Sequence, residues 1–153
     1  MILDGDILAY FDSIHKDVRY TDGQTSSFEF NLDYLSLKLW SSILLNHTND
    51  MVSFVIKINN VLVCESVYRL LNEFNNKSIL LKAYYDKTSY QIIVKGNQYA
   101  KEENLIYIIE GYTSSIKGDE YDILEELYKY KGTLKDSSKD DSLDTLMGLL
   151  SKS

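Results

Sequence analysis

Residues 78–95, SILLKAYYDKTSYQIIVK, decide the fold class, because two alternating apolar segments flank a short polar turn. Runs of this length and alternation, rich in Ile, Val and Tyr, are typical of β-strands, and the turn predicts a hairpin. If Tyr85 pairs with Tyr90 across the turn, one face of the hairpin is apolar. That face consists of Leu81, Ala83, Ile92 and Val94. We expect it to contact the core.

The opposite face of this hairpin is polar and basic. It carries Lys82, Tyr84, Gln91 and Lys95, and the alternating segment 54–58 adds Lys57. Lysines can bind phosphates, and an exposed tyrosine can stack on a base. The sequence therefore predicts a nucleic-acid-binding surface on this side of the sheet. The alternative is an ordinary solvent-exposed face, on which lysines guard against edge-to-edge aggregation.

Acidic and basic residues are unevenly distributed along the chain. Between Met51 and Lys101, seven basic residues outnumber three acidic ones, although the whole chain has a formal net charge of −7. Both flanking segments are acidic. A basic middle can meet nucleic acid, whereas acidic ends would repel it.

Working outward from the hairpin, the chain predicts helices on both sides. Apolar residues recur at helical spacing in 4–16, 31–47, 66–76 and 119–132. Trp40 falls on the predicted core side of the second segment. A further hairpin, 54–58 with 61–64, and a strand at 105–109 are predicted from short apolar runs, and residues 20–27 are predicted as a loop. The expected fold is α+β: a small, mainly antiparallel sheet of two hairpins plus one or two further strands, packed with N- and C-terminal helices.

The length of 153 residues suits one domain, which we place at 1–132. Residues 133–141 are polar and predict a flexible linker. Residues 142–153 form a short amphipathic segment whose apolar side is Leu143, Leu146, Met147 and Leu150. We expect it to dock on a partner protein. The alternatives are packing on its own domain and disorder.

No catalytic motif stands out. Cys64 is the single cysteine, and neither His15 nor His47 has a metal-ligand spacing. Phosphate-loop, dinucleotide and esterase motifs do not occur. We therefore predict no enzyme activity, no cofactor and no metal. A remote alternative is a metal-dependent nuclease that uses the early acidic residues Asp4, Asp6 and Asp12 with Glu29 and Asp33.

The longest apolar runs are far shorter than the roughly 20 residues that a membrane span needs. Acidic residues stand near the N-terminus, where a secretory signal would be basic. We expect a cytoplasmic protein that does not contact membranes. The preferred hypothesis is a non-catalytic accessory or regulatory protein of a nucleic-acid-handling complex, which binds a partner protein and possibly single-stranded nucleic acid. The alternative is an acidic protein–protein interaction module, a subunit or inhibitor, without nucleic-acid contact.

Overall fold

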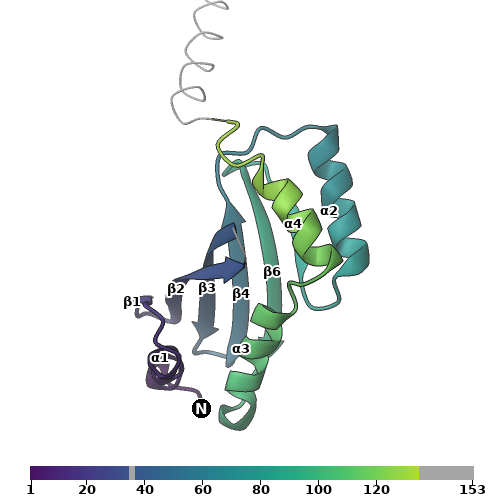
Figure 1. The fold of residues 1–153 in the computed structure, drawn as a ribbon. Coiled ribbons are helices and arrows are strands. Elements are labelled where there is room, and N and C mark those ends of the chain that lie inside the picture. The colour runs from purple at the N-terminus through teal and green to yellow at the C-terminus, as the bar shows by residue number, and fades with distance from the viewer. Residues whose placement is uncertain (35–36, 135–153) are drawn as a thin grey trace, which may run out of the picture.

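One six-stranded antiparallel sheet organises the protein in a computed structural model, which describes residues 1–34 and 37–134 (Figure 1). The strand order is β1-β2-β3-β4-β6-β5. The elements are α1 (Asp4–Ser13), β1 (Arg19–Thr21), β2 (Thr25–Tyr34), β3 (Leu37–Asn46), β4 (Met51–Ile58), α2 (Glu65–Lys77), β5 (Lys82–Asp86), β6 (Gln91–Tyr99), a 3₁₀ turn (Glu102–Asn104), α3 (Leu105–Ser114) and α4 (Asp119–Tyr128). The predicted α+β class with a mainly antiparallel sheet is confirmed.

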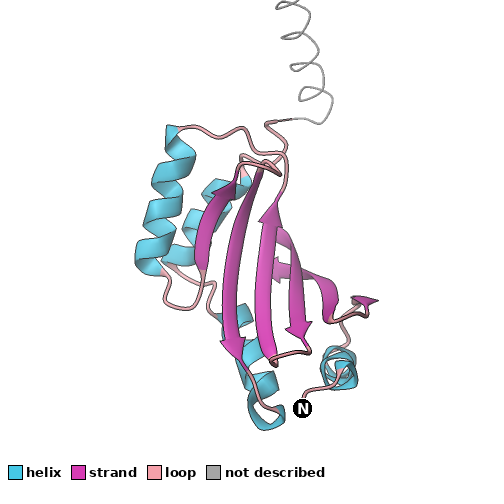
Figure 2. Cartoon of the chain, turned by 180° about the vertical axis from the view of Figure 1, so that it is seen from behind, coloured by secondary structure: helices cyan, strands magenta, loops and turns pink. Residues whose placement is uncertain are grey.

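The helices cover one face of the sheet and leave the other without a helix among the described residues. Figure 1 shows α3 and α4 in front of the strands, and in Figure 2 the sheet is seen from its other side with helices behind it. The core lies between the two layers. Its largest fully buried side chains include Phe11, Phe28, Phe30, Phe54, Phe74 and Tyr112.

The predicted helix at 31–47 is wrong, because these residues belong to β2 and β3, which pair with each other. In β3, Leu37, Leu39, Ile43 and Leu45 are buried at every second position, with Ser41 between them. A serine on the buried face interrupts the apolar alternation, so a spacing of three and four residues fits the remaining leucines equally well. The Ser41 hydroxyl is satisfied by the carbonyl oxygen of Leu39 at 3.2 Å.

The predicted loop at 20–27 is also wrong in part, because β1 and the start of β2 occupy it. The segment is polar, and its strands are held by backbone pairs such as Tyr20 with Phe28. Stacking of these two rings, with centroids 5.2 Å apart, adds an apolar contact. The polar composition of this segment therefore favours a loop, but its backbone pairing with the neighbouring strand makes it a β-strand.

The predicted strand at 61–64 is wrong, although Asn60 has the positive φ of 56° that its turn was expected to need. β4 pairs instead with β3 and β6, so β6 occupies the place expected for 61–64. Val61 is buried and donates its backbone N–H to the Tyr90 carbonyl oxygen at 2.9 Å. The chain then leads directly into α2.

The predicted hairpin of β5 and β6 is confirmed, with its register shifted by two residues. Tyr85 pairs with Ile92 rather than with Tyr90. A shift of two keeps every side chain on its expected face, since strand side chains alternate with a period of two. The predicted apolar face is accordingly buried: Leu81, Ala83, Ile92 and Val94 are at most 3% exposed.

The predicted strand at 105–109 is wrong, because α3 begins at Leu105. Its buried residues recur at helical spacing: Leu105, Ile108, Ile109 and Tyr112. Tyr112 stacks on Phe54 of the sheet, with ring centroids 5.8 Å apart. This close approach uses Gly96, since a Cβ there would lie 2.6 Å from Tyr112 Cε1. A short apolar run cannot by itself distinguish a buried helix from a buried strand.

The helix predicted at 119–132 is shorter, because α4 ends at Tyr128 and Gly132 follows in a left-handed conformation with φ of 76°. The next two residues still contact the domain. Thr133 Oγ1 accepts a hydrogen bond from the Leu62 N–H at 2.9 Å, and the Leu134 N–H donates to Asn60 O at 2.8 Å. The rest of the predicted linker and the segment 142–153 lie outside the described residues.

Candidate nucleic-acid interface

The sheet face without helices, which we call the open face, brings the predicted lysines onto neighbouring strands. Lys57 of β4 pairs with Ile93 of β6, and Ile93 pairs with Tyr84 of β5. Because antiparallel partners point to the same side of a sheet, these three side chains form one row across the strands. Lys95 lies two residues along β6 from Ile93 and therefore on the same face.

Trp40 belongs to the same face of the sheet. It lies on β3 directly before Ser41, the first residue of β3 that pairs with β4, so the alternation of β3 places Trp40 on the open face, just beyond the paired part of the two strands. Trp40 is 40% exposed and Tyr84 is 46% exposed. The prediction that Trp40 is a core residue of a helix is wrong. Recognising the two-residue alternation of 37–46 would have placed it here.

Two apolar residues of the open face are almost fully buried. Val55 on β4 is 6% exposed and Ile93 on β6 is 7% exposed. Long flanking side chains, including the aliphatic parts of lysines, can cover such residues while their charged ends reach water. The aromatic and basic side chains of the open face therefore surround apolar residues that have little contact with water.

The central strands of the open face carry basic charge alone. Within β3, β4 and β6 the charged residues are Lys38, Lys57 and Lys95, and no acidic residue occurs in these strands. The acidic residues of the face lie toward its edges: Glu29, Asp33 and Asp86. On the helical side, α4 contains five acidic residues and no basic one. The central strands of the open face and α4 therefore carry opposite charge.

Two of the five predicted binding residues are engaged elsewhere. The Lys82 ammonium donates hydrogen bonds to the carbonyl oxygens of Asn75 and Ser78, each at 3.0 Å, at the C-terminal end of α2. The Gln91 amide donates to Asn59 Oδ1 at 2.5 Å beside the turn. Lys82 pairs directly with Lys95, so it remains next to the face. The structure therefore groups Lys57, Tyr84 and Lys95 with Trp40, and places Lys82 and Gln91 at the margin.

A second polar cluster joins the start of α1 to the end of the sheet. His47 Nε2 lies 2.8 Å from Asp4 Oδ1 and 3.0 Å from Ser26 Oγ, and Ser26 donates to Asp4 Oδ2 at 2.8 Å. Tyr20 also donates to Asp4. Burial raises the pKa of the Asp4 carboxyl, but hydrogen bonds from Tyr20 and Ser26 and the neighbouring His47 outweigh it and hold the pKa below its ordinary value.

These residue types also occur in nucleophilic triads, but their arrangement differs. In a triad the histidine contacts the serine and the acid through different ring nitrogens. Here Asp4 and Ser26 approach the same nitrogen of His47, and Ser26 is fully buried. The cluster therefore serves to fasten α1 to the sheet.

The early acidic residues do not converge in the structure. Asp6 accepts a hydrogen bond from the Leu3 N–H at 2.9 Å and so caps α1, whereas Asp4 belongs to the cluster with His47. In residues 1–34 and 37–134, no group of three or more His, Cys, Asp or Glu side chains is placed to hold a metal ion. Among the described helices, none has the length and apolar character needed to cross a membrane.

The predicted partner-binding residues Leu143, Leu146, Met147 and Leu150 lie outside the described residues. Comparisons with known proteins add no further assignment: the chain matches no family model, no curated protein and no solved structure. The functional argument therefore rests on the open face itself.

Proposed function

We propose that the protein is a non-catalytic accessory or regulatory component of a cytoplasmic nucleic-acid-handling complex, and that its open face binds single-stranded nucleic acid. One observation carries the proposal: Trp40 and Tyr84 belong to the same open face, with Lys57 on a strand between theirs, and the central strands of that face carry no acidic residue. Proteins that bind single strands without sequence preference combine these two features, aromatic platforms for bases and lysines for the backbone.

The spacing of the two aromatic residues suits an extended strand. Paired β-strands lie about 4.8 Å apart and three strand steps lead from β3 to β5, so a ligand must span on the order of 14 Å or more to reach both Trp40 and Tyr84. An unstacked strand can place separate bases on the two rings across this distance. A duplex buries its base faces in its own stack and offers the rings nothing to contact. Single-stranded ligands are therefore favoured over double-stranded ones.

The experiment is a fluorescence-anisotropy titration of labelled single- and double-stranded oligonucleotides with the full chain at several salt concentrations. We expect tighter binding of the single strand, with log affinity falling linearly with log salt as phosphate contacts are lost. No binding of either oligonucleotide at an ionic strength of about 0.1 M, where the Debye length is still about 10 Å, would reject the proposal.

A second candidate function uses the opposite side of the molecule. α4 carries Asp119, Glu120, Asp122, Glu125 and Glu126. A face of this charge attracts a basic partner, which agrees with an acidic interaction module that acts as a subunit or inhibitor. Under this alternative, oligonucleotides do not bind, and a basic protein co-purifies with the chain in a salt-sensitive manner.

A further inference from the structure

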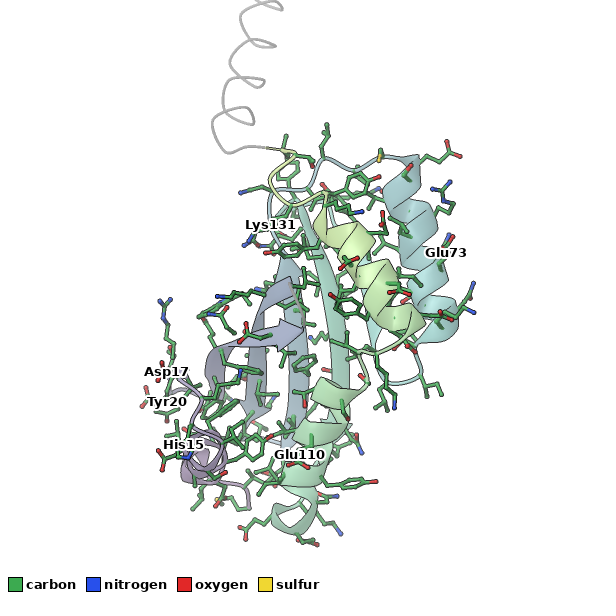
Figure 3. The ribbon with its side chains drawn as sticks, viewed as in Figure 1. His15, Asp17, Tyr20, Glu73, Glu110 and Lys131 are labelled. Carbon is green, nitrogen blue, oxygen red and sulfur yellow. The ribbon has the colours of Figure 1, made fainter. Side chains whose placement is uncertain are left out.

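A hollow of about 470 Å³ lies at the β2 end of the open face. It is lined by the segment 15–19, by Glu29, Asn31 and Asp33 of β2, and by Trp40 of β3. In Figure 3, His15 and Asp17 lie at the outer edge of the sheet, next to α1. Trp40 belongs both to this hollow and to the open face that carries Lys57 and Tyr84. The hollow therefore continues the proposed interface.

The indole of Trp40 supplies a flat wall. The Arg19 guanidinium carbon lies 5.6 Å from the centre of the Trp40 ring, and Arg19 Nη1 lies 3.9 Å from a carboxylate oxygen of Glu29. A guanidinium above an aromatic ring and a base above an aromatic ring use the same planar contact. Arg19 is 73% exposed and can move aside or cover the outer face of a base on Trp40.

The charges of the hollow argue against a phosphate as its occupant. Asp17, Glu29 and Asp33 are acidic, and Lys16 and Arg19 are basic. The Lys16 ammonium already donates to the Asn31 carbonyl oxygen at 2.6 Å. The acids outnumber the bases, so a neutral group rich in N–H donors fits better than an anion. Ionised carboxylates only accept hydrogen bonds, so Glu29 and Asp33 can serve as acceptors for such N–H groups.

We propose that this hollow binds one unstacked base of the bound strand and prefers guanine. The inference rests on the function proposed above and names the base that the same interface selects. Guanine presents two adjacent N–H donors, at N1 and N2, on its Watson–Crick edge. One carboxylate can accept both hydrogen bonds, whereas the corresponding edges of the other bases pair a donor with an acceptor. Stacking on Trp40 then holds the guanine ring, and the carboxylates of β2 accept hydrogen bonds from its Watson–Crick edge.

The test compares a short oligothymidylate with the same oligonucleotide carrying one central guanine. Binding is followed by anisotropy and by the emission of Trp40, which is the single tryptophan of the chain. We expect at least about fivefold tighter binding of the guanine-containing strand, with quenching of Trp40. The double variant Glu29→Gln/Asp33→Asn should bind both strands equally. The matched control Glu120→Gln/Asp122→Asn removes the same charge from α4 and should keep the preference.

The outcomes separate the two proposals. If the two strands bind the native protein with equal affinity, the guanine pocket is overturned while the single-strand interface stands. If the preference survives in Glu29→Gln/Asp33→Asn, the assignment of the carboxylates is overturned. Absence of binding to either strand rejects the interface, and the pocket with it. Thermal unfolding of each variant checks that it folds, which these isosteric changes should permit.

Discussion

Trp40 and Tyr84 lie on the same face of the sheet, on β3 and β5, with Lys57 and Ile93 between them on the two intervening strands. Nothing in the local sequence around either residue links them. The link arises because β6 inserts between β4 and β5. The proposed interface therefore depends on the strand order and on the contacts that hold the strands in this order.

Gly96 permits the contact between α3 and the sheet. An alanine Cβ at this position would lie 2.6 Å from Tyr112 Cε1 and 2.8 Å from the Leu80 carbonyl oxygen, and the backbone atom cannot move away cheaply. We expect Gly96→Ala to lower the free energy of unfolding by about 1–3 kcal/mol, measured by urea denaturation. The matched control is Gly111→Ala within α3, where a Cβ meets nothing within 4 Å. It should stabilise the protein by up to about 1 kcal/mol. Equal effects of the two substitutions would contradict this packing.

Asn75 protects the outer edge of β5. Its side-chain amide donates to the Ala83 carbonyl oxygen at 2.9 Å and accepts from the Ala83 N–H at 2.7 Å, as a neighbouring strand would. Asn75→Ala should lower the free energy of unfolding by about 1–3 kcal/mol. It should also expose a strand edge that promotes self-association. Denaturation and light scattering measure the two effects. The exposed neighbour Asn76→Ala should change neither, and aggregation of both variants alike would argue against the edge role.

Asp4 gives the stability of the fold a defined pH dependence. The pKa of Asp4 in the folded protein lies below the ordinary value of an aspartate, so the ionised carboxylate stabilises the fold at neutral pH. This contribution is lost in acid, as the pH falls through the lowered folded-state pKa. Asp4→Asn should lower the free energy of unfolding by about 1 kcal/mol at neutral pH, and the difference should shrink in acid. Exposed Asp12→Asn is the matched control and should leave the free energy of unfolding at neutral pH nearly unchanged. A difference that stays constant down to strongly acidic pH would contradict the account.

The C-terminal segment was predicted to bind a partner protein. Replacing Leu146 and Met147 with aspartate should remove a co-purifying partner, because its apolar side would become charged. Oligonucleotide binding and thermal stability should not change. Asp substitutions at Ser142 and Thr145 are the control. Retention of the partner after the Leu146 and Met147 substitutions would reject the segment as the docking site.

The sequence predicts the faces of the strands better than the identities of the elements. At β5 and β6 the apolar residues Leu81, Ala83, Ile92 and Val94 fall at every second position, so the inward residues were predicted correctly even though the register differs by two. At β3 the buried Ser41 broke the alternation, and Trp40 was assigned to a helical core. At α3 the run from Leu105 to Ile109 was too short to reveal its period.

The candidate site was predictable where it depended on alternation within a strand. The sequence alternation placed Tyr84 and Lys95 of one hairpin and Lys57 of β4 on the outward side, and all three share the open face. The engagement of Lys82 with the end of α2 was not predictable, because it depends on how the helix turns back onto the strand. Trp40 was missed because residues 31–47 were interpreted as a helix, although the two-residue alternation of 37–46 places it on the open face.

The most direct test of the central claim is the affinity of charge-reversal variants for a labelled single-stranded oligonucleotide at moderate salt. Lys57→Glu and Lys95→Glu should each weaken binding, and together should lower the affinity by about tenfold or more and reduce its salt dependence, because phosphate contacts are lost. Lys117→Glu, an exposed residue between α3 and α4, should bind as the native protein does. If the Lys57→Glu/Lys95→Glu variant folds and binds with native affinity, the open face is not the nucleic-acid interface.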